Sequence, residues 1–179
     1  MAHDLHYEIT PTINRAERYP QIARDWSSLF DPLAGWTANA ANLCALLTAG
    51  FGWWWVGFYL VRNEDSTLVL GPFQGPVACT RIPKGKGVCG TAWERNQPLV
   101  VPDVEQFPGH IACSSLSRSE LVIPVHANGE VVGVLDLDSV KLNDFGPQDL
   151  EALIPMLDLL QSVWPVELSD EGVELKSSR

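Results

Sequence analysis

The chain has 179 residues, of which 46% are hydrophobic and seven are tryptophan, and this favours one soluble domain with a full core. Its formal net charge of -10 excludes nucleic acid or an anionic membrane as the expected partner, because both would repel it. The chain has no apolar run of roughly 18 residues and no signal-peptide pattern at its start, so we expect a cytoplasmic protein.

Two helices are predicted before the first strand. Residues 1–17 have no clear period and are expected to form a loose leader. Pro20 suits the first turn of a helix in which apolar residues then recur at spacings of three and four. A second helix is expected to begin near Thr37 and to end at Gly50 and Gly52. The side chains that it presents to the core are expected to be Ala40, Leu43, Cys44 and Leu47.

Residues 53–62 are aromatic and β-branched and predict a central strand that is buried on both faces. A period of two places one set of residues on a shared face, namely Trp53, Trp55, Gly57 and Tyr59. Trp55 and Tyr59 are either core aromatics or the wall of a pocket, with the tyrosine hydroxyl as a polar group.

Further extended segments follow at 67–73 and 75–83, and a short helix is expected at 90–96 before a brief strand in 99–104. Asn128-Gly129 then joins 120–127 to 130–139 and predicts a type I′ hairpin turn.

The last predicted helix begins at Pro147, has Asp149 in its first turn and carries an apolar stripe. Residues 167–179 are charged and are expected to be disordered. The pattern therefore predicts one α+β domain over residues 18–166, with helices layered on an antiparallel sheet.

Three of the four cysteines, Cys79, Cys89 and Cys113, fall in one stretch between strand-like segments. Their spacing fits neither a zinc knuckle nor a C-x-x-C redox pair. They are either buried structural thiols or thiols that meet in space and exchange oxidation states. The cytosol keeps thiols reduced, so a transient catalytic disulfide fits that compartment better than a lasting structural one.

Residues 85–90 match the G-x-G-x-x-G pattern, but the helix that follows is too short and no ribose-binding carboxylate is suitably placed for a dinucleotide site. These glycines are expected to form a tight turn into a helix. His110 precedes Cys113 at a spacing that metal ligands sometimes use, but no second pair matches it. We therefore expect a solvated His110 and neither a metal nor a cofactor.

Asp136 and Asp138 lie in an otherwise apolar segment, where a period of two puts both on the face of Val132 and Val134. Two carboxylates on such a face are costly to bury unless they bind a cation or one of them holds a proton. The alternative is a strand end that reaches solvent.

Glu120 presents a conflict of register. If the hairpin turn sets a strict register, Leu121 opposes Asp136 and Glu120 faces the other way. Glu120 joins the two aspartates only if it lies in the loop or beside a β-bulge.

Several segments, taken in order, resemble the free methionine-(R)-sulfoxide reductases, a catalytic branch of the GAF-domain fold. They are WWVGFYL, GPFQG, CTRIPKGKGVCGTA, PGHIAC, SELVIP and GVLDLDS. The likeness covers about residues 20–165 and implies a single GAF-like domain, with the terminal helices on one face of a central antiparallel sheet and a loop-formed pocket on the other. The chain departs from the family at Ser114, where an acidic residue is common, and at Arg118.

The resemblance implies that Cys113 is the attacking thiol, Cys79 the resolving thiol and Cys89 an auxiliary thiol. It also implies a pocket for free methionine sulfoxide lined by Trp55, Tyr59, Glu120, Asp136 and Asp138. A thiolate can attack the sulfoxide sulfur only if the oxygen is protonated, so the site needs a nucleophile and an acid together. Glu120 is expected to be that acid, while the aspartates bind the substrate ammonium.

The expected reductant is of the thioredoxin type, and the resemblance also suggests a homodimer, although an ordinary core explains the apolar helices equally well. Two other functions stay open. In the first, the chain is a non-catalytic GAF sensor of a small ligand. In the second, it is a thiol switch in which Cys79 and Cys113 pair without substrate turnover.

Overall fold

The computed structural model describes residues 14–111 and 115–164. The α-helices are α1 (Arg15–Leu29), α2 (Gly35–Phe51), α3 (Gly87–Arg95) and α4 (Pro147–Gln161), and two short 3-10 turns span Asn63–Asp65 and Val104–Gln106. The strands are β1 (Trp55–Arg62), β2 (Thr67–Gln74), β3 (Arg81–Pro83), β4 (Leu99–Val101), β5 (Ser119–Ala127) and β6 (Glu130–Ser139).

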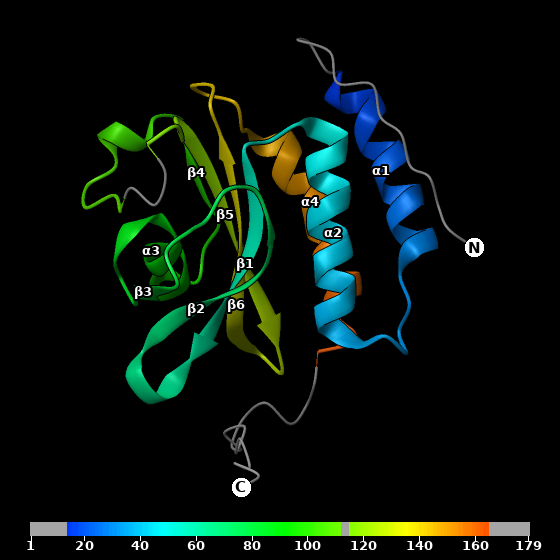
Figure 1. Cartoon of the computed structure of the whole chain (residues 1–179), viewed down its shortest axis with the longest axis horizontal. Helices are drawn as coiled ribbons and strands as arrows, with labels where there is room; N and C mark the ends of the chain where they lie inside the picture. The colour runs from blue at the N-terminus through cyan, green and yellow to red at the C-terminus, as the bar shows by residue number, and fades with distance from the viewer. Residues whose placement is uncertain (1–13, 112–114, 165–179) are drawn as a thin grey trace, which may run out of the picture.

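The strands form one antiparallel sheet in the order β3-β2-β1-β6-β5-β4, so β1 and β6 are central as the apolar pattern predicts. Helices α1, α2 and α4 cover one face of the sheet, whereas α3 and the connecting loops lie on the other (Figure 1). Each face has its own hydrophobic cluster. The predicted α+β class and the layering of the helices are confirmed.

Helix α1 begins at Arg15, inside the predicted leader, and Pro20 lies within the helix and not in its first turn. The early start is explained by an ion-pair network. Arg15 donates to Asp149 and to Asp144 at 2.7 Å each, and the Tyr19 hydroxyl donates to Asp149 at 2.6 Å. These partners hold the first turn of α1 against the first turn of α4.

Helix α2 begins at Gly35, two residues before the predicted cap at Thr37, and ends at Phe51, where Gly52 caps it with a left-handed φ of 67°. Its predicted core residues are buried. Trp53 precedes β1 and packs with Phe51 on the helix side, so the prediction that it shares a face with Trp55 and Tyr59 is wrong.

Asn128 and Gly129 have φ angles of 52° and 82°, which confirms the predicted type I′ hairpin between β5 and β6. The strict register is wrong beyond its first two pairs. His126 still opposes Val131, but Val125 opposes Gly133. A β-bulge therefore separates the turn from the rest of the hairpin.

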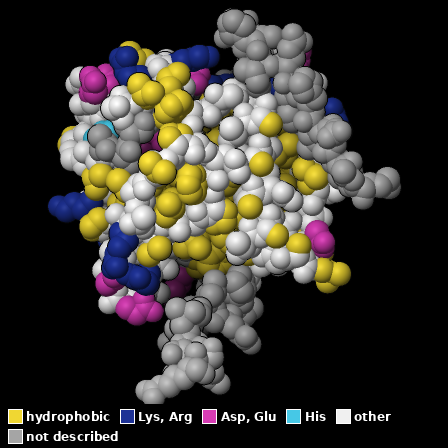
Figure 2. Space-filling model, viewed as in Figure 1, with side chains coloured by type: hydrophobic (Ala, Val, Ile, Leu, Met, Phe, Trp, Pro, Cys, Tyr) yellow, Lys and Arg dark blue, Asp and Glu magenta, His cyan; other side chains and the backbone are white. Residues whose placement is uncertain are grey.

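On the face seen in Figure 2, hydrophobic side chains gather near the centre and the acidic ones are scattered around the rim. Within the described ranges, no helix is both long and apolar enough to cross a membrane. The expected homodimer stays a prediction, because the inward faces of α1 and α4 are explained by the protein's own core.

Candidate active site

A pocket opens on the face of the sheet that α3 covers. Its aromatic wall comes from β1, where the rings of Trp55 and Tyr59 stack with centroids 5.8 Å apart. The Trp55 Nε1 donates to the carbonyl of Pro76 at 3.2 Å, and the Tyr59 hydroxyl donates to the carbonyl of Cys79 at 3.0 Å. These bonds orient both rings and tie the segment that carries Cys79 to the wall of the pocket.

Two glycines make room for the Trp55 ring. A Cβ at Gly57 would lie 2.3 Å from Cη2 of Trp55, and one at Gly75 would lie 2.6 Å from its Cδ1. Gly75 also has a φ of 136°, which disfavours other residues. The position of the aromatic wall therefore depends on two residues that have no side chain.

The floor of the pocket is acidic. Across the central strands, Asp138 of β6 pairs with Trp55 of β1 on one side and with Glu120 of β5 on the other. Asp136 pairs with Gly57, one step further along the same face. The β-bulge brings Glu120 to this face, because it moves every pair beyond it by one residue.

Glu120 and Asp136 are each 6% exposed, which excludes for Asp136 the alternative of a strand end that reaches solvent. The bulge also corrects the predicted face of Val132, which packs against the helix-side cluster, whereas Val134 lies on the pocket side.

Burial raises the pKa of all three carboxyls, and the neighbouring aspartate charges raise those of Glu120 and Asp136 further. The pKa of Asp138 rises to about 6, since burial outweighs a hydrogen bond with Ser117. Burial and the charge of Asp136 also raise the pKa of the Tyr59 phenol. The three carboxyls together therefore hold at least one proton near neutral pH, and the protonated one can act as an acid.

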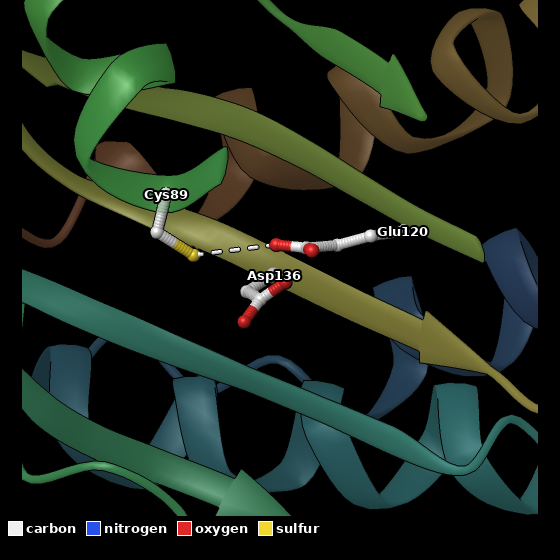
Figure 3. Close-up of side chains that lie close together, drawn as sticks. All are labelled: Cys89, Glu120 and Asp136. Atoms are coloured by element: carbon white, nitrogen blue, oxygen red, sulfur yellow. Dashed lines mark hydrogen bonds between the residues drawn. The ribbon is translucent and has the colours of Figure 1, made fainter. Parts of the chain in front are cut away.

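Cys89 faces the acids from helix α3. The positive φ angles of Gly85 and Gly87 form the predicted tight turn, which makes α3 begin three residues before the predicted 90–96 and so include Cys89. The Cys89 Sγ donates to Glu120 Oε1 at 3.8 Å (Figure 3). Burial and the nearby carboxylates raise its pKa, so Cys89 stays a thiol and acts as a donor.

The cysteines that the structure describes differ in whether they are free or disulfide-bonded. Cys44 is fully buried in the helix-side core, as predicted, and is free, as is Cys89. Cys79 is partly buried, packs beside the pocket-side cluster and is disulfide-bonded. The predicted nucleophile Cys113 and the family departure at Ser114 lie outside the described residues.

Two polar pocket residues were missed by sequence reasoning. The prediction of a solvated His110 is wrong, because its side chain is 17% exposed and its Nε2 lies 3.8 Å from Glu120 Oε2. Burial lowers its pKa, so the ring is neutral at neutral pH. Ser117 also lines the pocket and bonds Asp138. Both lie in irregular segments, where periodicity carries no signal.

The model of the GAF domain matches residues 36–163. The chain is 51% identical to the GAF domain-containing protein A of Dictyostelium discoideum, over 90% of this chain and 100% of that protein. It is 44% identical to the free methionine-R-sulfoxide reductase of Escherichia coli, over 84% of this chain and 91% of that one. The chain belongs to the free methionine-R-sulfoxide reductase family.

A solved structure of a free methionine-R-sulfoxide reductase, the Neisseria meningitidis enzyme in complex with its substrate, agrees with this chain at a TM-score of 0.77. The two are 46% identical, over 89% of this chain and 96% of that one. The range matched by the GAF-domain model includes every described residue of this pocket, so the acidic pocket lies within the GAF domain.

Proposed function

We propose that the protein reduces free L-methionine-(R)-S-oxide to L-methionine. The observation that carries the proposal is the group of buried carboxyls beside a stacked aromatic wall. Such a pocket suits a small molecule with a cationic group and an apolar chain. Family membership supports the same reaction.

The acidic residues divide into two roles. Asp136 and Asp138 bind the substrate ammonium, whose positive charge favours their ionised forms. Glu120 keeps its proton and donates it to the sulfoxide oxygen, a role supported by its raised pKa, which burial and the charges of Asp136 and Asp138 cause. Trp55 and Tyr59 form the apolar wall along the methionine side chain.

Cys113 is the proposed nucleophile. Its sulfur attacks the sulfoxide sulfur and takes over the oxygen, which leaves methionine and a sulfenic acid on Cys113. The Cys79 thiol then displaces that oxygen as water and forms a disulfide, which a thioredoxin-type dithiol reduces. The disulfide-bonded state of Cys79, with Cys44 and Cys89 free, supports this pairing.

Cys89 is an auxiliary thiol in this scheme. Its burial and raised pKa disfavour the thiolate, and this supports Cys79 as the resolving residue. We place the enzyme in the cytosol, where thioredoxin-type reductants keep such disulfides in turnover.

The same chemistry explains the expected selectivity. Methionine sulfoxide inside a peptide has no free ammonium and would leave the buried carboxyls unpaired, which is costly. The S epimer directs its oxygen away from Glu120, because mirror-related oxygens cannot reach the same acid.

The test is amino-acid chromatography of free methionine sulfoxide incubated with the protein and a thioredoxin system. The R epimer should yield methionine, whereas the S epimer and the Cys113→Ser variant should yield none. Cys44→Ser is the matched control, because it changes a free thiol outside the pocket, and it should retain activity.

Either of two results would overturn the proposal that the protein is an enzyme. If a chemical dithiol also fails to support turnover while the amino acid still binds, the protein is a sensor. If peroxide forms the disulfide but methionine sulfoxide is never consumed, the protein is a thiol switch.

A further inference from the structure

Cys89, Glu120 and Asp136 converge on one point from three different elements, α3, β5 and β6 (Figure 3). Their potential ligand atoms, one sulfur and two carboxylate oxygens, all lie within 4.8 Å of one another. The three residues are 3%, 6% and 6% exposed. This group therefore places soft and hard ligand atoms together at a buried position.

A separate observation points to a cation as the partner of this group. Within the part of the chain that the structure describes, Asp136 Oδ1 is buried and has no hydrogen-bond partner. A buried carboxylate oxygen without a partner is costly, and coordination of a cation is one of the few ways to satisfy it.

We propose that Cys89, Glu120 and Asp136 form a binding site for Zn²⁺. A thiolate ligand disfavours Mg²⁺ and Ca²⁺, which take oxygen ligands, whereas zinc accepts sulfur and carboxylate together. Zinc bonds of about 2.3 Å to sulfur and about 2.0 Å to oxygen place tetrahedral ligand atoms roughly 3.5 Å apart. The separation of 3.8 Å between Cys89 Sγ and Glu120 Oε1 is close to that value.

His110 lies beside one member of this group. Its Nε2 is 3.8 Å from Glu120 Oε2. His110 also lines the pocket, so the site is reached through the same opening as the pocket itself.

Zinc and substrate compete for this site. This consequence, unlike the binding itself, rests on the proposed function, which assigns Asp136 to the substrate ammonium and Glu120 to its oxygen. Zinc would hold both carboxyls and so act as a competitive inhibitor with respect to methionine sulfoxide.

Zinc binding is measured on the tag-free full chain without reductant, so that Cys79 stays disulfide-bonded as in the structure. The protein is equilibrated with zinc sulfate, and the bound metal is determined after dialysis. Co²⁺ serves as a second probe, because a bond between the metal and a thiolate gives a charge-transfer absorption.

We expect about one Zn²⁺ per chain and a thiolate band with Co²⁺. Cys89→Ser should remove the band. Cys89→Ser and Asp136→Asn should each weaken zinc binding by more than the roughly 10–100-fold that the loss of an outer-shell partner costs. Cys44→Ser is the matched control, because it changes the other free thiol among the described residues, and it should bind zinc as the parent does.

The proposal is wrong if the parent retains no zinc, or if both variants bind it as tightly as the parent. Circular dichroism of each variant shows whether it is folded, and Glu120→Gln provides a further ligand variant. Because zinc binding is measured without substrate, failure of the reductase activity leaves this result unaffected.

Discussion

Replacement of Asp138 by asparagine should stabilise the protein at neutral pH and remove part of its pH dependence. Burial raises the pKa of Asp138 from 3.8 to about 6. A carboxyl with a raised pKa contributes stability that is fully present below its unfolded pKa and is lost as the pH rises through its folded pKa. The charged form is therefore unfavourable in the native protein at pH 7.

The size of the effect follows from these values. Going from pH 5 to pH 7, the parent should lose about 1.4 kcal/mol of unfolding free energy through Asp138, and Asp138→Asn should lack this loss. At pH 7 the variant should gain up to about 3 kcal/mol on charge alone. Both figures are upper values, because Asp138 is partly exposed and water screens its charge.

Urea unfolding of the parent and of Asp138→Asn at pH 5 and pH 7 measures both quantities. Asp158→Asn is the control, because it makes the same exchange at an exposed position on α4, outside the pocket. A variant that is less stable than the parent at pH 7, or that has the same slope with pH, would refute the reasoning. Methionine formation by Asp138→Asn should fall, because the carboxylate that binds the ammonium is lost.

Two further predictions concern the aromatic wall. Gly57→Ala should displace the Trp55 ring, destabilise the fold by about 1–3 kcal/mol and raise the KM. Thermal unfolding and steady-state kinetics measure these effects, and an unchanged KM would contradict the prediction. Tyr59→Phe removes the hydrogen bond to the carbonyl of Cys79 and should cost about 1–3 kcal/mol in urea unfolding. The Cys79 disulfide should then be reduced faster by dithiothreitol, and an unchanged rate would show that the bond does not restrain Cys79.

Local signals predicted the elements that depend on neighbours in the chain. Asn128-Gly129 predicted the hairpin turn, and the glycines at 85 and 87 predicted the turn into α3. The start of α1 was missed because it depends on Arg15 meeting Asp144 and Asp149, more than a hundred residues away. No periodicity within the first residues contains that information.

The residues of the candidate site also divide into those that local periodicity predicted and those that it could not place. A period of two placed Trp55 with Tyr59 and Asp136 with Asp138. It could not place Glu120, whose face depends on a bulge elsewhere in the hairpin, nor His110, which lies in a loop. The turn alone predicted the opposite face for Glu120. Of the two exceptions considered, a loop position and a β-bulge, the structure contains the bulge.

The pairing of β5 with β6 decides which side chains of β5 enter the helix-side core and which face the pocket. The β-bulge sets that pairing. In the unbulged pairing, Glu120 would turn into the helix-side core, and Leu121, Ile123 and Val125 would leave it. These three side chains are at most 3% exposed, and each contributes about 1.5–3 kcal/mol by its burial. Aliphatic residues that never touch a ligand thus select the face on which the acid stands. A substitution that weakens their burial should therefore inactivate the protein by strand slippage, with every pocket residue still present in the chain.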